Sequence, residues 1–229
     1  MTFDSAQTAL ALPAQEVYSR LYSEWGAQHW WPAETPFEVV IGAILTQNTA
    51  WSNVEQAVAA LRSEKLLDPK IMGGISAEHL AELIVPSGYY NLKARRILNF
   101  MQMLNEEYAG DLERLFRLET GQLRSVLLSV NGIGPETADS ILLYAAERPV
   151  FVVDAYTRRF LLRHAWIEGG ENYDEIAAIF TGSLPCDLRI YNEFHALIVK
   201  LGKLHCRRRA ECADCPLNVY PLREGRGDV

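Results

Sequence analysis

The stretch LLSVNGIGPETADSILLY, residues 127–144, decides the fold class. It predicts the end of one helix, a tight turn over Asn131–Gly134, and a second helix that begins at Pro135, because proline suits the first turn of a helix. Two glycines allow backbone amides to approach a phosphate closely, and the N-terminus of the following helix offers N–H groups and a favourable dipole. The turn is therefore a candidate phosphate-binding site, and an ordinary helix-to-helix turn is the alternative.

Helical periodicity continues through the rest of the chain. Apolar residues recur at spacings of three and four in the segments 37–47, 52–61, 77–85, 93–108, 120–129, 137–146, 155–166, 173–181 and 189–201. Glycine and proline turn signals separate these segments. The one β-like run, Val150–Val153, is short and ends at Asp154, a residue suited to cap the next helix. We therefore predict an all-α protein of about ten helices.

The predicted helices group into two lobes. Residues 36–148 form a self-contained, barrel-like helical series that includes the helix-hairpin-helix at about 124–144. Residues 1–35 and 149–229 are both needed for a second helical lobe, which carries a cysteine loop at 206–215. A cleft between the lobes is the expected ligand site.

Composition narrows the class of protein. The chain has 229 residues, of which 49% are hydrophobic and 22% charged, and this excludes disordered and collagen-like chains. No apolar run approaches the roughly 20 residues of a membrane span, and the N-terminus lacks the positively charged start of a signal peptide. We expect a soluble, cytoplasmic protein, in bacteria located at the nucleoid. The net charge of −7 argues against indiscriminate coating of polyanions, but local clusters of Lys and Arg permit contact with nucleic acid.

The segment Leu128–Asp154 carries a longer pattern than the turn alone: hydrophobic-x-Gly-Ile-Gly-x-x-Thr-Ala, then a helix, then Val-Val-Asp. It resembles the helix-hairpin-helix and Gly/Pro…Asp core of the endonuclease III superfamily of DNA glycosylases. The similarity extends from about Phe37 to Cys215 and includes a Gln-x-Thr loop at residues 47–49 and the segment Tyr90–Ala94. The resemblance implies hydrolysis of the N-glycosidic bond of a damaged base flipped out of double-stranded DNA.

The same resemblance implies which residues contact DNA. In the hairpin these are Gly132, Gly134 and Thr137. In the early loop, Gln47 and Asn48 are candidates for filling the gap left by the extruded base or reading its partner, and bridging or capping of helices is the alternative. We expect a monomer that binds DNA and no membrane.

Asp154 is the candidate catalytic carboxylate. The resemblance implies that it stabilises positive charge on the sugar and helps to position water, as carboxylates do in glycoside hydrolysis. Bifunctional relatives place a nucleophilic lysine two residues past the second hairpin glycine, where this chain has Glu136, and a glutamate cannot form a Schiff base. Glu136 is either an acidic residue that suits the helix dipole or a pocket group that holds water.

The sequence therefore predicts a monofunctional glycosylase without lyase activity. Two alternatives stay open. One is a DNA-damage-binding paralogue with little or no turnover. The other is a bifunctional enzyme that uses a different lysine, such as Lys93 or Lys200.

Three tryptophans are candidates for the base pocket: Trp30, Trp31 and Trp51. Together with the Gln-Asn-Thr loop they resemble the monofunctional 3-methyladenine glycosylase branch of the superfamily. That branch implies a pocket that sandwiches an alkylated purine between aromatic rings, which suits a cationic methylated base. The alternative for each tryptophan is packing within the N-terminal lobe.

The cysteines favour a metal over disulfides, because three of the four fall in the pattern Cys206-x5-Cys212-x2-Cys215. The resemblance implies a [4Fe-4S] loop. However, the family pattern has six residues in the first gap, and Pro221 stands where the fourth cysteine is expected.

A cubane cluster needs a fourth ligand, for which His205 and Cys186 are the candidates. A zinc site with three cysteines and one histidine, or a loop without metal, remain as alternatives. Within the loop, Arg207, Arg208 and Arg209 are candidate phosphate contacts.

Overall fold

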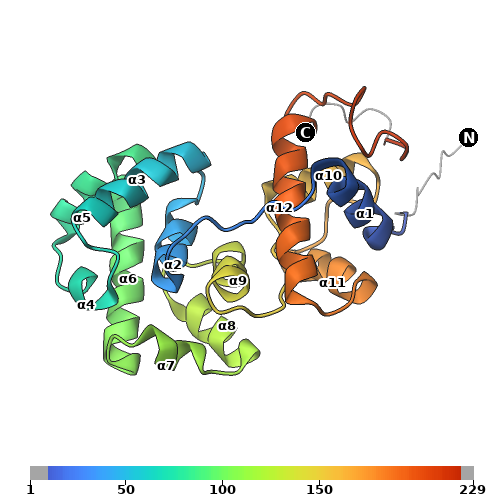
Figure 1. Cartoon of the computed structure of the whole chain (residues 1–229). Coiled ribbons are helices and arrows are strands. Elements are labelled where there is room, and N and C mark those ends of the chain that lie inside the picture. The colour runs from blue at the N-terminus through green and yellow to red at the C-terminus, as the bar shows by residue number, and fades with distance from the viewer. Residues whose placement is uncertain (1–9, 223–229) are drawn as a thin grey trace, which may run out of the picture. The chain divides into compact units, whose positions relative to one another are not determined.

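The computed structural model describes residues 10–222, which fold into helices joined by short connections (Figure 1). No β-strand occurs among these residues, so the predicted all-α class is confirmed. The run Val150–Val153 is extended and largely buried but pairs with no strand in the described chain. No helix within residues 10–222 is long and apolar enough to cross a membrane.

The chain divides into two compact units. One unit is Trp31–Arg148, and the other combines the described residues up to Trp30 with those from Pro149 onward. The unit Trp31–Arg148 contains α2 (Pro36–Leu45), α3 (Trp51–Ser63), α4 (Pro69–Met72), α5 (Ala77–Leu83), the 3-10 helix η1 (Val85–Ser87), α6 (Tyr90–Tyr108), α7 (Leu112–Phe116), α8 (Thr120–Ser129) and α9 (Pro135–Tyr144).

Helix α2 is the central element of this unit. It is buried from Phe37 to Leu45 and packs against α3, α6 and α9, which explains why its sequence is apolar on every face. The helix begins where the Thr35 side chain accepts a hydrogen bond from the Glu38 N–H and proline occupies the first turn.

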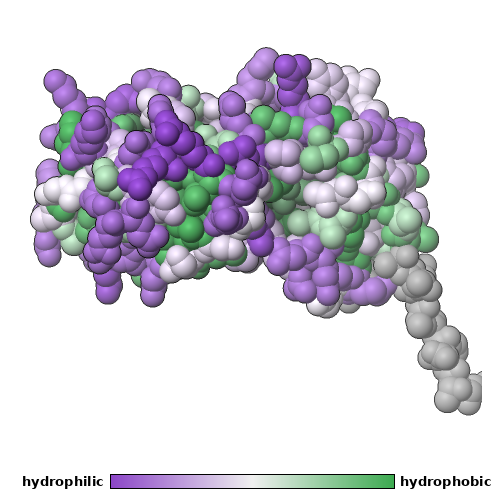
Figure 2. Space-filling model, turned by 90° about the horizontal axis from the view of Figure 1, so that it is seen from below, coloured by the Kyte–Doolittle hydropathy of each residue, from purple (hydrophilic) through white to green (hydrophobic). Residues whose placement is uncertain are grey.

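Figure 2 shows hydrophilic side chains over most of the visible surface, interrupted by smaller hydrophobic areas.

The second unit contains α1 (Ala14–Trp25), α10 (Ala155–Arg163), α11 (Tyr173–Ser183) and α12 (Leu188–Leu204). Helices α1 and α10 both pack against α12, so the start of the chain completes a bundle formed mainly by its end. Aromatic rings fill the core: Phe151 stacks on Phe180 with ring centroids 3.8 Å apart, and Phe194 meets Phe151 edge-on at 5.9 Å.

Periodicity located most helices within a few residues but did not detect α1, which has 12 residues, or the shortest helices. Helices α4 and α7 have four and five residues, too few to display a period of 3.6. Each begins at an aspartate, Asp68 or Asp111, whose side chain accepts a hydrogen bond from a first-turn N–H. Helix α9 begins at Pro135, as the turn signal predicted, because proline fits its first position, whereas apolar spacing alone placed the start at residue 137.

Candidate active site and nucleic-acid interface

The helix-hairpin-helix consists of α8, the turn Val130–Gly134, and α9. Gly132 has a φ of +99°, and a Cβ placed on it would lie 2.8 Å from Cδ of Arg96 and nearer still to Cγ. Gly134 is extended and caps α9, and a Cβ placed there would meet nothing within 4 Å. The fold therefore requires glycine at 132, whereas at 134 the missing side chain leaves open space beside the N-terminus of α9.

The loop between α2 and α3 is joined to this hairpin by Gln47. Its side-chain amide donates hydrogen bonds to the Gly132 carbonyl at 3.0 Å and to the Thr137 hydroxyl at 2.9 Å, and Arg96 donates to the Gln47 side-chain oxygen. Thr137 itself is buried. Asn48 is exposed and has a φ of +52°, the left-handed region that asparagine tolerates well. Of the two predicted loop residues, Gln47 therefore connects the loop to the hairpin, whereas Asn48 is exposed.

Asp154 caps α10 through its carboxylate. One oxygen accepts hydrogen bonds from the Thr157 N–H at 2.7 Å and the Thr157 hydroxyl at 2.9 Å. The other lies 3.7 Å from Nε2 of His195, a buried residue of α12. Burial raises the pKa of Asp154, but the His195 and Thr157 donors outweigh it, and the net pKa is lowered. Asp154 is therefore an ionised carboxylate at neutral pH.

Glu136 lies exposed in the first turn of α9. A carboxylate at this place is favoured by the positive end of the helix dipole. Its backbone carbonyl accepts a hydrogen bond from the Ser140 hydroxyl at 2.7 Å. Lys93, one of the two lysines considered as substitute nucleophiles, is buried with its Nζ bonded to three oxygens.

The tryptophans do not form a single cluster. Trp31 meets Trp51 edge-on with ring centroids 5.0 Å apart, and lies 5.3 Å from the Tyr144 ring. Trp30 belongs to the other unit, where Nζ of Lys203 lies 5.9 Å from its ring centroid. Adjacent positions in the chain thus serve two different units.

A cavity of about 270 Å³ lies beside Trp31 and Trp51. A Cβ on Gly42 would lie 3.2 Å from the Trp31 ring, so the glycine makes room for this indole. Two carboxylates contribute to the lining. Glu38 is buried and bonded to Arg62 at 2.6 Å, and Glu55 accepts from the Trp51 indole N–H at 2.8 Å. Arg62 also lines the cavity and pairs with Glu38, so the cavity combines tryptophan rings with one net negative charge, which suits a flat, cationic ligand.

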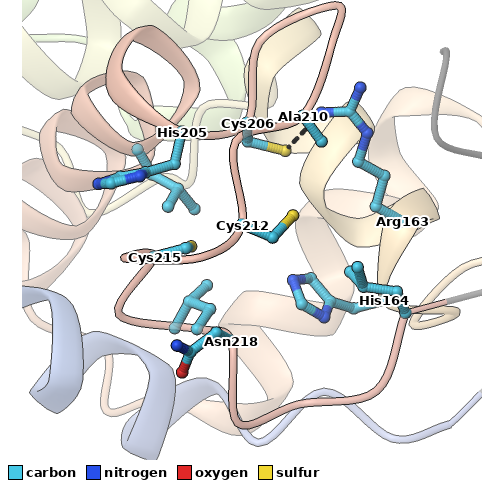
Figure 3. A pocket seen from close by; sticks show the side chains of 11 residues that line it. Arg163, His164, His205, Cys206, Ala210, Cys212, Cys215 and Asn218 are labelled. Atoms are coloured by element: carbon cyan, nitrogen blue, oxygen red, sulfur yellow. Dashed lines mark hydrogen bonds between the residues drawn. The ribbon is translucent and has the colours of Figure 1, made fainter.

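The three cysteines of the 206–215 loop line one small cavity together with His164 and His205 (Figure 3). In Figure 3 the His205 ring points away from Cys206 and Cys212. The ring stacks on Trp25 with centroids 6.0 Å apart, and its Nδ1 lies 3.2 Å from the Glu211 carbonyl oxygen.

Cys186 lies far from this cavity. It is exposed and precedes α12, whereas Cys206 follows the same helix. The helix has 17 residues, which at a rise of 1.5 Å per residue separates the two cysteines by about 25 Å. Of the two predicted fourth ligands, one is distant and the other is turned away.

Arginines hold the cysteine loop in this arrangement. Arg163 donates to Sγ of Cys206 at 3.1 Å and to the Arg208 carbonyl at 2.6 Å, and Arg159 donates to the Cys206 carbonyl at 2.6 Å. Among residues 10–222, no group of three or more His, Cys, Asp or Glu side chains is arranged to hold a metal ion. The donor types suit a metal, but their arrangement here does not form the predicted centre.

The three successive arginines of the loop are all exposed. Arg207 donates to the Lys203 carbonyl at 2.7 Å and pairs with Glu211 at 3.2 Å. The Arg208 carbonyl accepts the hydrogen bond from Arg163, so this contact does not involve the Arg208 side chain.

Comparison with known proteins identifies the class. A model of the HhH-GPD superfamily of base excision DNA repair proteins matches residues 41–186. A candidate DNA repair glycosylase of Methanocaldococcus jannaschii is 49% identical over 209 residues, which cover 90% of this chain and 94% of that protein. Endonuclease III of Thermotoga maritima is 29% identical over 206 residues, covering 85% of this chain and 87% of that enzyme.

Solved structures agree with this assignment. The H. pylori 3-methyladenine DNA glycosylase bound to 1,N6-ethenoadenine superposes with a TM-score of 0.74 at 30% identity, covering 84% of this chain and 98% of that one. Endonuclease III in a non-covalent DNA complex gives a TM-score of 0.78 at 23% identity over 94% of this chain and 97% of that one, which shows the shared fold. The chain belongs to the HhH-GPD superfamily of base excision DNA repair proteins. Within that class it is a DNA glycosylase of the endonuclease III family, as the sequence resemblance predicted.

Proposed function

We propose that this chain is a monofunctional glycosylase that releases an alkylated purine from double-stranded DNA. The observation that carries the proposal is the Asp154 carboxylate, held ionised by Thr157 and His195. An ionised carboxylate is the group that this hydrolysis requires, because positive charge develops on the sugar as the base departs.

The reaction divides into two changes at the sugar. The bond between the base and the anomeric carbon breaks, and its electron pair leaves with the base. The Asp154 carboxylate stabilises the resulting oxocarbenium-like charge, and its hydrogen bonds to Thr157 keep it in place without neutralising it. Water then adds to the anomeric carbon and releases one proton to the solvent, which gives an abasic site.

Two side chains support the monofunctional assignment. Glu136 occupies the position where bifunctional relatives carry lysine, and a carboxylate cannot attack the sugar to give an imine. Lys93, a candidate substitute nucleophile, is only 1% exposed and directs its Nζ to three oxygens within its own unit. Its amine is therefore engaged in structure.

The cavity beside Trp31 and Trp51 supports a cationic purine as the substrate. Aromatic rings attract a positively charged ring, and Glu55 leaves the cavity with a net negative charge because Arg62 balances Glu38. The H. pylori relative, a 3-methyladenine glycosylase, was solved with a modified adenine, 1,N6-ethenoadenine. A methylated purine is a good leaving group, so its departure needs little acid catalysis. The pocket then has mainly to recognise the base, which aromatic rings can do.

We infer that duplex DNA is held by the hairpin, by Asn48 and by exposed arginines of the cysteine loop. The open space at Gly134 and the N-terminus of α9 suit a phosphate. Arg208 and Arg209 are exposed and would contribute sequence-independent contacts to the backbone.

The [4Fe-4S] cluster stays a prediction of the family resemblance. Three thiols lining one cavity support it, whereas the Arg163 contact to Cys206 and the absence of an arranged donor group in residues 10–222 weigh against it. Iron and zinc analysis of anaerobically purified protein tests this directly. About four iron atoms per chain support the cluster. Stoichiometric zinc or no metal rejects it.

The decisive experiment for function is base release from a panel of duplexes that carry alkylated, ethenylated or oxidised bases, measured by chromatography. We expect release of methylated purines and an intact abasic strand. Tight binding to damaged duplexes without release would instead support a damage-binding paralogue. Strand cleavage at the abasic site would reject the monofunctional assignment.

A further inference from the structure

Lys93 is a buried charge with an unusual set of partners. It lies in the first turn of α6 and is only 1% exposed. Its Nζ donates three hydrogen bonds: to the Leu45 carbonyl at 2.7 Å, to the Thr49 hydroxyl at 2.6 Å and to the Ser87 carbonyl at 2.6 Å. Three N–H donors thus meet three acceptors, which satisfies the ammonium group completely.

These acceptors belong to three different segments of one unit. Leu45 is the last residue of α2, Thr49 lies in the loop that follows, and Ser87 ends the 3-10 helix η1. None of the three carries a formal charge. The negative end of the α2 dipole offsets part of the cost of burying the ammonium. Burial, with the nearby charge of Arg96, still lowers the pKa of Lys93 to about 8.

A residue that served only to fill this volume would not need a charge, because an apolar side chain would do so without desolvation. What the ammonium adds is a connection between the two ends of the loop 46–49. It donates one hydrogen bond where α2 ends, at Leu45, and another at Thr49. The Thr49 hydroxyl in turn donates to the Ser87 carbonyl.

Of residues 46–48, which lie between these two anchors, Asn48 is the exposed one, and its φ of +52° is uncommon for a residue other than glycine. Gln47 is held separately by the hairpin. The loop is therefore fixed at both ends by Lys93 and at its side by Gln47, and its tip presents Asn48.

We propose that Lys93 is a positioning residue for DNA engagement, holding the 46–49 loop so that Asn48 occupies the gap left by the extruded base. The inference rests on the proposed function for the extrusion step. The effect of Lys93 on the position of the loop does not depend on base release, and it can be measured on DNA that contains no base to release.

The test compares Lys93→Met with wild type. Methionine keeps most of the length of the stem and removes all three hydrogen bonds. Lys70→Met is the matched control, because Lys70 is exposed on α4. Thr49→Val removes one of the three acceptors and carries the test if Lys93→Met does not fold.

Base release is measured for one lesion in two settings: paired with its normal partner, and opposite an abasic analogue, where extrusion costs little. For Lys93→Met we expect the paired rate to fall about 10- to 100-fold, as for a group misplaced by about 1 Å. The unpaired rate should change by less than about threefold, because the step that the loop assists is no longer limiting. Thr49→Val should show a smaller loss with the same selectivity. Equal losses in both settings, or no loss in either, would overturn the proposal.

The second measurement needs no catalysis. A duplex with a stable abasic analogue and 2-aminopurine beside the gap reports insertion of the loop as a change in fluorescence. Wild type and Lys70→Met should give the full change at saturation, and Lys93→Met a reduced one. If wild type releases no base from any lesion, the proposed function fails, but this fluorescence comparison still decides the role of Lys93.

Discussion

The side-chain amide of Gln47 donates to the Thr137 hydroxyl at 2.9 Å, which joins the loop after α2 to the first turn of α9. The same nitrogen reaches the Gly132 carbonyl, so one side chain fixes the loop to both parts of the hairpin. Two motifs that lie about 90 residues apart in the sequence therefore form one continuous surface. Glutamine at this position acts as a bridge in the free protein.

Replacing Thr137 by valine should weaken this surface. The valine side chain has nearly the same volume but cannot accept the hydrogen bond, which leaves the Gln47 amide with one partner fewer. We expect the free energy of unfolding to fall by about 1 kcal/mol. Affinity for damaged duplex, measured by fluorescence anisotropy at fixed salt, should fall several-fold. Thr181→Val, on the exposed side of α11, is the control, and an equal loss in that variant would contradict the bridge.

The two hairpin glycines should respond differently to alanine. At Gly132 the left-handed backbone and the crowding against Arg96 make alanine costly, and we expect a loss of about 1–3 kcal/mol of stability. At Gly134 the new methyl group meets nothing in the protein, so stability should change by less than about 0.5 kcal/mol.

DNA binding separates the role of Gly134 from its effect on folding. If a phosphate approaches this glycine, Gly134→Ala should weaken binding to all duplex sequences alike, since phosphate contacts carry no sequence information. Anisotropy titrations on two unrelated sequences and denaturant unfolding of the same samples check this. Unchanged affinity, or a loss confined to one sequence, would show that no phosphate lies there.

The sequence was sufficient for those features that depend on local chemistry. The hairpin was recognisable because glycines and a proline stand at fixed offsets, and Asp154 because an aspartate before a helix is both a cap and a carboxylate. The boundaries of α8 followed directly from its apolar spacing.

Contacts set by tertiary packing were not predictable in this way. His195 stands 41 residues after Asp154, on a helix whose apolar stripe gives no sign that one of its members is a partner of the carboxylate. Trp30 and Trp31 are adjacent, yet the division between units passes between them. The three oxygens around Lys93 come from three segments, so only the folded unit reveals why a lysine is buried there.

Asp154→Asn tests the chemistry. Asparagine also caps helices, so we expect α10 to persist and the free energy of unfolding to change by no more than about 1 kcal/mol. Duplex affinity should be retained. Base release should fall by a factor of about 10² to 10³, the usual effect of removing an electrostatic group that acts on the transition state. Single-turnover release assays give this ratio, and undiminished release would remove Asp154 from the mechanism.

Borohydride trapping tests the absence of a lysine nucleophile. Wild-type protein should give no covalent adduct with DNA that contains the substrate lesion or an abasic site, because Glu136 cannot form an imine and the Lys93 amine is engaged. Glu136→Lys restores an amine at the position used by bifunctional relatives and should yield a trapped band on a denaturing gel. A high yield of trapped adduct with the wild-type protein would contradict the monofunctional assignment.

The ionisation of Lys93 predicts opposite effects of pH on stability and on DNA engagement. The pKa of Lys93 is about 8 in the folded protein, compared with an ordinary value of 10.5. Below pH 8 both folded and unfolded chains hold the proton. Between pH 8 and 10.5 the unfolded chain binds more protons, so the free energy of unfolding rises with pH. The charged ammonium is thus a cost to folding that is fully present below pH 8.

In Lys93→Met this dependence is absent. We therefore expect the difference in unfolding free energy, wild type minus variant, to increase in favour of wild type between pH 8 and 10, by at most about 3 kcal/mol. Contributions from other titrating groups cancel in this difference. Denaturant unfolding at pH 7, 8, 9 and 10 measures it, and Lys70→Met should run parallel to wild type throughout.

Over the same pH range the loop should lose order. A neutral amine has two N–H groups for three acceptors, so one of the contacts to Leu45, Thr49 or Ser87 is no longer supported. The 2-aminopurine signal of wild type should decline from pH 7.5 to 9.5 while its stability rises, whereas that of Lys93→Met should stay low and flat. Parallel stability curves for wild type and Lys93→Met would mean that Lys93 keeps its proton up to its ordinary pKa, and the predicted opposition between stability and loop order would then be wrong.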